Sequence, residues 1–130
     1  MKIRLPLLRQ EIVNNTIVSQ EEILEVELDT SVYSEERWEQ NFPELAKREG
    51  LFQYIERIHE ATKNGEVDKR VSVISMLKAI YCFLEFEGYM DYKSFCKMFN
   101  LAQTEYTTKL IEELKRAFKL ILGSSSVKNL

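Results

Sequence analysis

Two stretches near the start of the chain, residues 2–7 and 24–29, have an aliphatic residue at every second position. A period of two puts apolar side chains on one face of a β-strand, so each stretch predicts a strand. Between them, Asn14 and Asn15 separate two short apolar pairs, and asparagine tolerates the positive φ that a tight hairpin turn needs. Pro6 has no N–H to donate, which favours an edge position for the first strand.

From residue 34 onward, apolar residues recur at the three- and four-residue spacing of a helix. Ser34 followed by charged residues is typical of an N-cap, because its hydroxyl accepts a hydrogen bond from an amide of the first turn. Pro43 restricts the backbone of the residue before it, so this helix is expected to end by Phe42. A second helix is predicted over residues 44–63, with Gly50 as the point where it can break.

Three more helices are predicted in the second half of the chain. Asp68 is expected to cap a helix over residues 69–87, whose broad apolar arc favours a central, buried position. Asp91 is expected to cap a short fourth helix, and the last helix is predicted over residues 104–122. Gly123 and the three serines after it are predicted to end regular structure.

The order of these elements, strands first and helices second, indicates an α+β fold. It is mainly α, with short antiparallel N-terminal strands packed on a bundle of four or five helices. The 130 residues fit a single domain. We expect that domain over residues 1–122, with a strand-rich part at 1–32, a helical part at 33–122 and a flexible tail at 123–130.

The composition is that of a globular domain: 45% of the residues are hydrophobic, 11% aromatic and 30% charged. The chain does not begin with an apolar leader, and its most apolar stretch, residues 71–86, is too short to span a bilayer. Two cysteines, Cys82 and Cys96, are fewer than a disulfide-stapled secreted domain normally carries. We therefore expect a cytoplasmic protein with no membrane partner.

The net charge is −3, which is too small to draw the chain to nucleic acid or to an anionic membrane. The charge is unevenly spread, however. Residues 1–66 carry 14 acidic and 8 basic side chains, and residues 67–130 carry 7 acidic and 10 basic ones. This polarity has two interpretations: two differently solvated faces, which is the favoured one, and head-to-tail self-association, which complementary faces would steer.

Motifs that hold metals, cofactors or phosphates are missing: there is no H-E-x-x-H, no C-x-x-C, and the four glycines are scattered. His59 is the single histidine, and we interpret it as a surface residue at the edge of a helical stripe. We therefore expect no enzyme activity, no cofactor and no metal, and a function that consists of binding other proteins.

The single tryptophan, Trp38, lies four residues before Phe42, so the two side chains share one face of the first helix. One interpretation is a core contact that fixes this helix on the domain. The other is an aromatic contact for a protein partner, because tryptophan and phenylalanine anchor many interfaces. The core contact is the favoured interpretation of the two.

Residues 92–100 and 104–122 have the outline of a helix-turn-helix and contain six basic residues. Against DNA binding, Glu105, Glu112 and Glu113 occupy the helix that would enter the groove, where phosphates would repel them. A small helix-turn-helix-like DNA-binding regulator is therefore the alternative function, and nucleic acid is not the expected partner.

Two neighbouring segments carry a family resemblance. Residues 30–44 read TSVYSEERWEQNFPE, with an R-W-E-x-x-F-P core, and residues 49–58 read EGLFQYIERI. Together they resemble the tail assembly chaperones of long-tailed phages and prophages of Gram-positive bacteria. The acidic strand before them and the helical second half follow the order of that family, so the resemblance covers residues 22–120.

The resemblance implies a chaperone that binds and solubilises the tape measure protein, a very long, hydrophobic, helical protein, and that is absent from the mature virion. We expect helix-in-groove contacts with this partner. The resemblance also implies self-association into a ring or spiral oligomer, and contact with tail tube subunits through a frameshifted longer form. It implies no catalytic or cofactor-binding residues.

The end of the chain generates a prediction about the gene. In the family that the chain resembles, a fraction of ribosomes slips back by one nucleotide near the end of the short reading frame. Val127, Lys128 and Asn129 permit this if their codons read A-AAA-AAC or A-AAA-AAU, because both tRNAs then keep most of their pairing. Slippage predicts that the gene shows this run and an open −1 frame, with residues 123–126 as the flexible joint. The alternative interpretation, held equally, is that Val127, Lys128 and Asn129 are a solvated tail after a helix. An AAG codon at Lys128, or no open −1 frame, would exclude slippage here.

Overall fold

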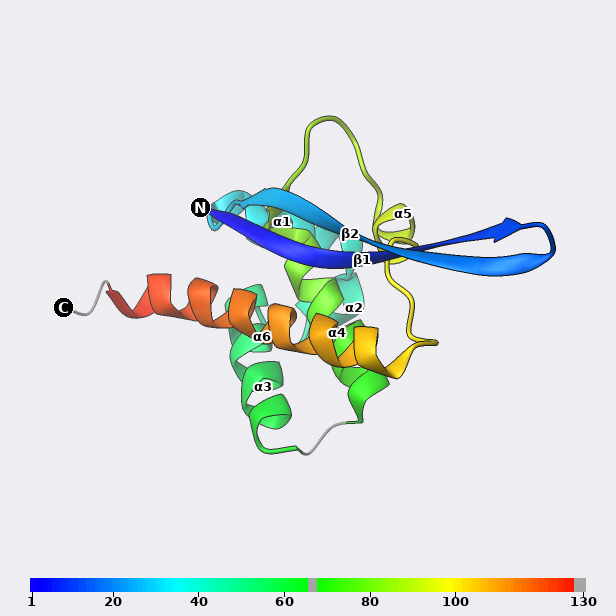
Figure 1. Cartoon of the computed structure of the whole chain (residues 1–130). Helices are drawn as coiled ribbons and strands as arrows, with labels where there is room; N and C mark the ends of the chain where they lie inside the picture. Colours follow the sequence, from blue (N-terminus) through cyan, green and yellow to red (C-terminus); the bar gives the residue numbers. More distant parts are fainter. Residues whose placement is uncertain (66–67, 128–130) are drawn as a thin grey trace.

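Two long strands lie across a group of helices in the computed structural model, which describes residues 1–65 and 68–127 (Figure 1). In chain order the elements are β1 Lys2–Val13, β2 Thr16–Leu28, α1 Val32–Asn41, α2 Pro43–Ala46, α3 Leu51–Lys63, α4 Lys69–Phe83, β3 Leu84–Glu85, α5 Tyr92–Cys96 and α6 Thr104–Val127. The predicted α+β fold, mainly α with antiparallel N-terminal strands, is confirmed. The strands were expected to be short, and β1 and β2 are instead 12 and 13 residues long. Within the described ranges, no helix combines the length and the apolar character needed to cross a bilayer.

The N-terminal strands form one long hairpin. β1 and β2 pair without interruption from the start of β1 to the connecting turn, where φ is 52° at Asn14 and 61° at Asn15. These values fit the two-residue turn that the sequence predicts. β3 pairs with the end of β2 to give the order β1-β2-β3, so β1 is an edge strand, as Pro6 indicated.

The core lies between the base of the hairpin and the helices. Ile3, Leu5 and Val26 bury their side chains from the hairpin. Helix α4 is central, as its broad apolar arc predicted, and packs against α1, α3 and α6. The largest fully buried side chains are Trp38, Phe83, Phe95, Phe118, Leu5, Leu51, Ile55, Met76, Ile80, Leu84, Leu110 and Leu114.

Helix α1 supplies the N-terminal cap of α3. Gly50 precedes α3 and has no side chain to accept a hydrogen bond from the first amides, and the Glu35 carboxylate of α1 takes this place. Its oxygens accept from the Leu51 N–H at 3.1 and 3.0 Å. The Trp38 Nε1–H donates to the Glu49 carbonyl oxygen at 3.1 Å. Because a carboxylate is also attracted to the positive end of a helix dipole, α1 fixes where α3 begins.

Helix α1 also closes the C-terminal end of α4. The Arg37 guanidinium donates to the Tyr81 carbonyl oxygen at 2.7 Å and to the Leu84 carbonyl oxygen. Its Cζ lies 5.3 Å from the centre of the Tyr81 ring, within reach of a cation–π contact. The last carbonyls of a helix lack hydrogen-bond partners inside the helix and form the negative end of its dipole. A guanidinium at this place donates hydrogen bonds to the carbonyls and is also attracted by the dipole.

The first helix begins earlier than the sequence predicted. Ser31, not Ser34, is the N-cap of α1, and its Oγ accepts from the Tyr33 N–H at 3.3 Å. Asp29 accepts from the Ser31 N–H at 2.9 Å. Ser34 is buried within the helix, and its hydroxyl donates to the Ser31 carbonyl oxygen at 2.7 Å. Both serines suit a cap, and the contact with Asp29 decides between them.

Helix α4 ends at Phe83, before its predicted end at residue 87. The next two residues become extended and form β3, which pairs with the end of β2. The Asp29 N–H donates to the Phe83 carbonyl oxygen at 2.6 Å, and Arg37 binds the Leu84 carbonyl oxygen. Contacts from β2 and α1 thus replace helical hydrogen bonds, which the apolar pattern of one segment does not reveal.

The predicted caps of α4 and α5 are confirmed. Asp68 Oδ1 accepts from the Arg70 N–H at 2.9 Å, and Asp91 Oδ1 accepts from the Ser94 N–H at 2.7 Å. The hydrogen bonds from Ser94 hold the pKa of the Asp91 carboxyl below its ordinary value, so this cap is ionised at neutral pH.

Helix α6 continues past its predicted end at Leu122 and runs to Val127. Glycine and serine disfavour a helix by about 1 kcal/mol or less per residue and do not stop it as proline does. The prediction that regular structure ends at Gly123 was therefore wrong, and the expected tail over residues 123–130 begins inside α6. Lys128 and Asn129 of the slip site lie outside the described residues.

The position of Trp38 generates a prediction about stability. Its side chain is fully buried, and its ring centroid lies 4.7 Å from that of Tyr54 and 5.5 Å from that of Phe42. Trp38→Ala removes these contacts and leaves a cavity, so we expect it to lower the free energy of unfolding by about 3–5 kcal/mol. Urea unfolding followed by circular dichroism measures this change.

Tyr33→Ala is the matched control, because Tyr33 is an aromatic residue on the same helix with 53% of its surface exposed. It is expected to change the free energy of unfolding by about 0.5 kcal/mol or less. An unchanged unfolding midpoint for Trp38→Ala would contradict the role of Trp38 as a core residue.

Candidate functional site

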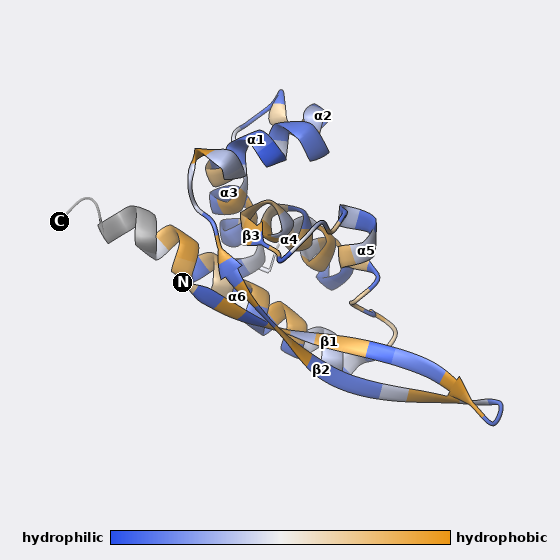
Figure 2. Cartoon of the chain, turned by 90° about the horizontal axis from the view of Figure 1, so that it is seen from above, coloured by the Kyte–Doolittle hydropathy of each residue, from blue (hydrophilic) through white to orange (hydrophobic). Residues whose placement is uncertain are grey.

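The far half of the hairpin projects beyond the helices, as both views of the chain show (Figures 1 and 2). We call residues 9–21 the arm; every one of them is exposed. The base of the hairpin packs on the core, whereas the arm contributes no buried side chain to it. The arm is thus a surface that the fold does not need for its own packing.

The end of the arm is apolar on both faces. Ile12 is 78% exposed and pairs across the strands with Ile17, which is 67% exposed. Val13 and Val18 are exposed to nearly half of their surface and lie on the opposite face, because side chains alternate along a strand. Figure 2 shows this apolar end next to the polar turn. Apolar residues gathered at one exposed place are typical of a protein interaction site.

Both edges of the arm present free backbone groups. Among the described residues, the backbone hydrogen bonds that join the strands to the rest of the protein lie outside the arm. On β1 the Leu8 N–H donates to the Met98 carbonyl oxygen at 3.2 Å, and on β2 the pairing with β3 involves Glu27 and Leu28. Free strand edges of this kind accept an additional strand from a partner.

Polar side chains brace the root of the arm. The Asn100 Nδ2–H donates to Gln10 Oε1 at 2.8 Å, and the Gln103 Nε2–H donates to Ser19 Oγ at 2.9 Å. One contact reaches each strand, and both come from the segment that leads into α6. They orient the arm without covering its apolar end.

The N-terminal half of α6 lies against the hairpin. The Tyr106 hydroxyl donates to the Pro6 carbonyl oxygen at 2.7 Å, and burial raises the pKa of Tyr106, so the hydroxyl stays protonated and donates. Lys109 forms a salt bridge of 3.1 Å with Glu21. A DNA-reading helix uses its N-terminal residues in the groove, and here the hairpin occupies part of that side. The geometry therefore gives the DNA-binding alternative no support.

The two candidate aromatic residues meet at the edge of the core. Trp38 is fully buried, and Phe42 is half-buried between the rings of Trp38 and Tyr92, with centroids 5.5 and 4.9 Å away. The Lys78 ammonium lies 6.0 Å from the centre of the Phe42 ring. Of the two interpretations, this geometry favours the core contact for Trp38.

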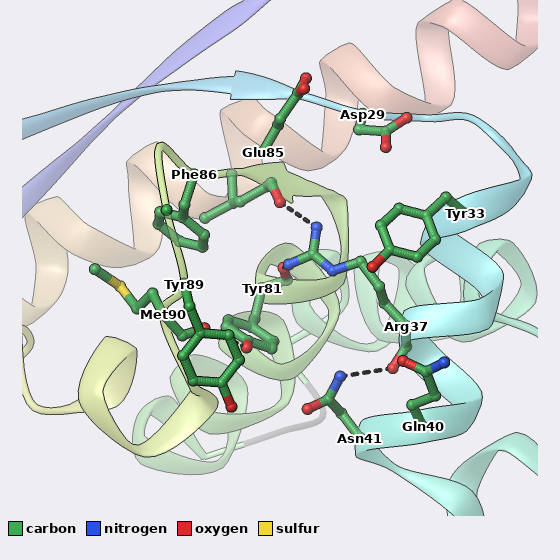
Figure 3. Close-up of a pocket in the computed structure, with 12 residues that line it drawn as sticks. Asp29, Tyr33, Arg37, Gln40, Asn41, Tyr81, Glu85, Phe86, Tyr89 and Met90 are labelled. Atoms are coloured by element: carbon green, nitrogen blue, oxygen red, sulfur yellow. Dashed lines mark hydrogen bonds between the residues drawn. The ribbon is translucent and has the colours of Figure 1, made fainter.

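A hollow of about 400 Å³ lies beside the C-terminal end of α4 (Figure 3). Two of the three charged residues that line it, Arg37 and Asp29, bind backbone groups, and the third is the exposed Glu85. Arg37 binds the carbonyl oxygens at the end of α4, and Asp29 accepts from Ser31, which lowers the pKa of the Asp29 carboxyl. Because both groups are already engaged in holding α1, we assign this hollow to the framework of the fold rather than to a reaction.

The cysteines are not activated. Burial raises the pKa of the Cys82 thiol to about 12, and burial also raises the pKa of the Cys96 thiol. A thiol reacts as its thiolate, so both groups are poor nucleophiles at neutral pH. Among the described residues, no group of His, Cys, Asp and Glu side chains is arranged to hold a metal ion.

Comparison with known proteins returned no match: neither a family model, nor a curated protein, nor a solved structure matches the chain. The sequence indicated the hairpin but not the arm as a surface. The feature of the sequence that could have indicated the arm is the two apolar pairs on either side of Asn14 and Asn15. They lie at the ends of strands that extend beyond the part that packs on the helices.

Exposure of the arm generates a prediction about stability. We expect the double change Ile12→Ala and Ile17→Ala to lower the free energy of unfolding by about 1 kcal/mol or less, because it removes one exposed cross-strand pair. Leu5→Ala in the base of the same hairpin is the control. Since Leu5 is fully buried, this change is expected to cost about 2–5 kcal/mol. Equal losses in urea unfolding would show that the arm belongs to the core.

Proposed function

We propose that the chain is a tail assembly chaperone of a long-tailed phage or prophage of Gram-positive bacteria. It binds and solubilises the tape measure protein during tail assembly in the host cytoplasm and leaves before the virion is complete. The observation that carries the proposal is the exposed apolar arm on a helical body. The resemblance of residues 30–44 and 49–58 to that family supports it.

The arm suits an apolar, extended or helical partner. Its exposed aliphatic side chains offer hydrophobic contact on both faces, and its free edges offer backbone hydrogen bonds. Full burial of one such side chain is worth about 1.5–3 kcal/mol, whereas association itself costs at least about 4 kcal/mol. Four partly covered side chains therefore do little more than offset this cost, so the contact of one copy is weak. Many copies on one long partner add up through multivalency, and each can still be displaced.

The residues that carry the family resemblance have framework roles. Glu35 caps α3, Arg37 caps α4 and Trp38 is fully buried against Tyr54 of α3. A resemblance in these residues argues for a shared arrangement of α1, α3 and α4. It does not assign the partner surface, which we infer from the arm.

Self-association is part of the proposed function. A ring or spiral of copies places many arms along one tape measure protein, which the weak contact of a single arm requires. Tail tube subunits are the second proposed partner, reached through a frameshifted longer form.

Co-expression with the tape measure protein of the same genome tests the proposal. We expect the soluble fraction of the tape measure protein to rise several-fold with the chain, and to fall back with Ile12→Ser and Ile17→Ser in the arm. Val71→Ser and Ile74→Ser are the control, because these aliphatic residues of α4 are exposed as well, to about half of their surface.

The outcomes test the chaperone function and the role of the arm as its contact surface separately. A tape measure protein that is equally insoluble with and without the chain overturns the chaperone proposal. Full solubilisation by the arm variant keeps the chaperone and overturns the arm as its contact. DNA retardation that weakens steeply with salt would instead favour the regulator.

A further inference from the structure

Four of the five acidic residues of the hairpin form salt bridges within the chain. Their partners are the N-terminal amine, basic residues of β1 and one lysine of α6. The pairs are Met1 N with Glu27, Lys2 and Arg4 with Glu25, Arg9 with Glu22, and Lys109 with Glu21. Glu11 is in none of the salt bridges of the described residues, and further unpaired negative charge lies on helices of the N-terminal half.

Helix α1 carries two acidic residues with no such partner. Glu36 and Glu39 are exposed, and none of the salt bridges within residues 1–65 and 68–127 includes either of them. Their spacing of three puts them on neighbouring positions of one side of the helix. Val32, which is 78% exposed, lies four residues before Glu36 on the same side. We call these three residues the acidic face of α1.

A basic groove of about 530 Å³ lies between α3 and α6. It is lined by His59 and Lys63 from α3 and by Glu112, Lys115, Arg116 and Lys119 from α6. Arg116 is paired with Glu113 at 2.6 Å, whereas none of the salt bridges in the described parts of the chain includes Lys63, Lys115 or Lys119. One acid, Glu112, faces these three lysines, so the groove holds an excess of positive charge.

We propose that the acidic face of α1 in one copy of the chain docks in the basic groove between α3 and α6 of the next copy. The inference rests on the self-association within the proposed function and names its two surfaces. Charge complementarity supports it: the unpaired acids of α1 meet the unpaired lysines of the groove. His59 lies in this groove, at the edge of the α3 stripe as the sequence indicated.

The spacing of the charges matches along the two helices. Glu36 and Glu39 are separated by about 4.5 Å along the axis of α1, and Lys115 and Lys119 by about 6 Å along that of α6. When α1 lies along α6, each carboxylate is within reach of one long lysine side chain. Exposed pairs of this kind contribute about 0.2–1 kcal/mol each and weaken with salt. The contact is therefore reversible and sensitive to ionic strength.

The two surfaces occupy different places on the chain. In Figure 1, α1 lies behind the strands near the top, and α3 and α6 approach each other in the lower half. A contact between two different surfaces leaves one of each free on every added copy. It therefore produces a ring or an open helix rather than a closed dimer.

Charge reversal tests the contact by static light scattering over a concentration series at low salt. The wild-type chain is expected to exceed its monomer mass of 15.4 kDa as concentration rises. Glu36→Lys with Glu39→Lys, and separately Lys115→Glu with Lys119→Glu, are each expected to give monomers. Mixing the two variants restores assembly, because the reversed face of one fits the reversed groove of the other.

Matched controls carry the same charge changes on other surfaces. They are Glu85→Lys with Glu87→Lys, and Lys93→Glu with Lys97→Glu, at residues that are all exposed. Both are expected to assemble like the wild type. Thermal melting by circular dichroism confirms that every variant is folded before its mass is measured.

Three results overturn the proposal: a wild-type chain that stays monomeric at high concentration and low salt, a closed dimer, or reversed variants that assemble like the wild type. Each is separable from the chaperone function, because the reversed variants keep the arm intact. If the chain solubilises the tape measure protein while any of these results holds, the proposed interface fails and only the binding of the tape measure protein stands.

Discussion

Three neighbouring residues of α1 hold the helical part of the protein together. Glu35 completes the start of α3, Arg37 completes the end of α4, and Trp38 is fully buried against Tyr54 of α3. A lost helix cap costs about 0.5–2 kcal/mol and a lost buried tryptophan about 3–5 kcal/mol. These contributions are large beside the 5–15 kcal/mol that typically separates folded from unfolded domains. The remaining elements are positioned relative to this junction.

The junction also determines where the hairpin sits. Because Arg37 holds the carbonyl at the start of β3, this short strand is placed to pair with the end of β2. The base of the hairpin then buries Ile3, Leu5 and Val26 on the helices, while the arm beyond Leu8 leaves the body. The same two strands thus contribute to stability at the base of the hairpin and present an exposed apolar surface at the end of the arm.

Local patterns predicted what local interactions determine. The alternation in β1 and β2, the turn at Asn14 and Asn15, and the cap at Asp68 follow from residues close in sequence. The start of α1 at Ser31 is also a local matter, since Asp29 accepts from the Ser31 N–H, but two nearby serines suited the cap and the sequence alone favoured the wrong one. The formation of β3 depends on contacts with β2 and α1, which are distant in sequence and which no pattern within one element contains. The candidate surfaces needed the structure too, because the sequence shows the total charge and not which charges are already paired.

The uninterrupted register of β1 and β2 limits how the length of the arm can change during evolution. One residue inserted in a single strand would force a bulge or shift the register, which exchanges the buried and exposed faces at the base. One residue added to each strand at paired positions keeps every pair below it and moves the tip outward by about 3.4 Å. Because residues 9–21 bury nothing in the core, such paired steps would alter the reach of the protein and leave its folding intact.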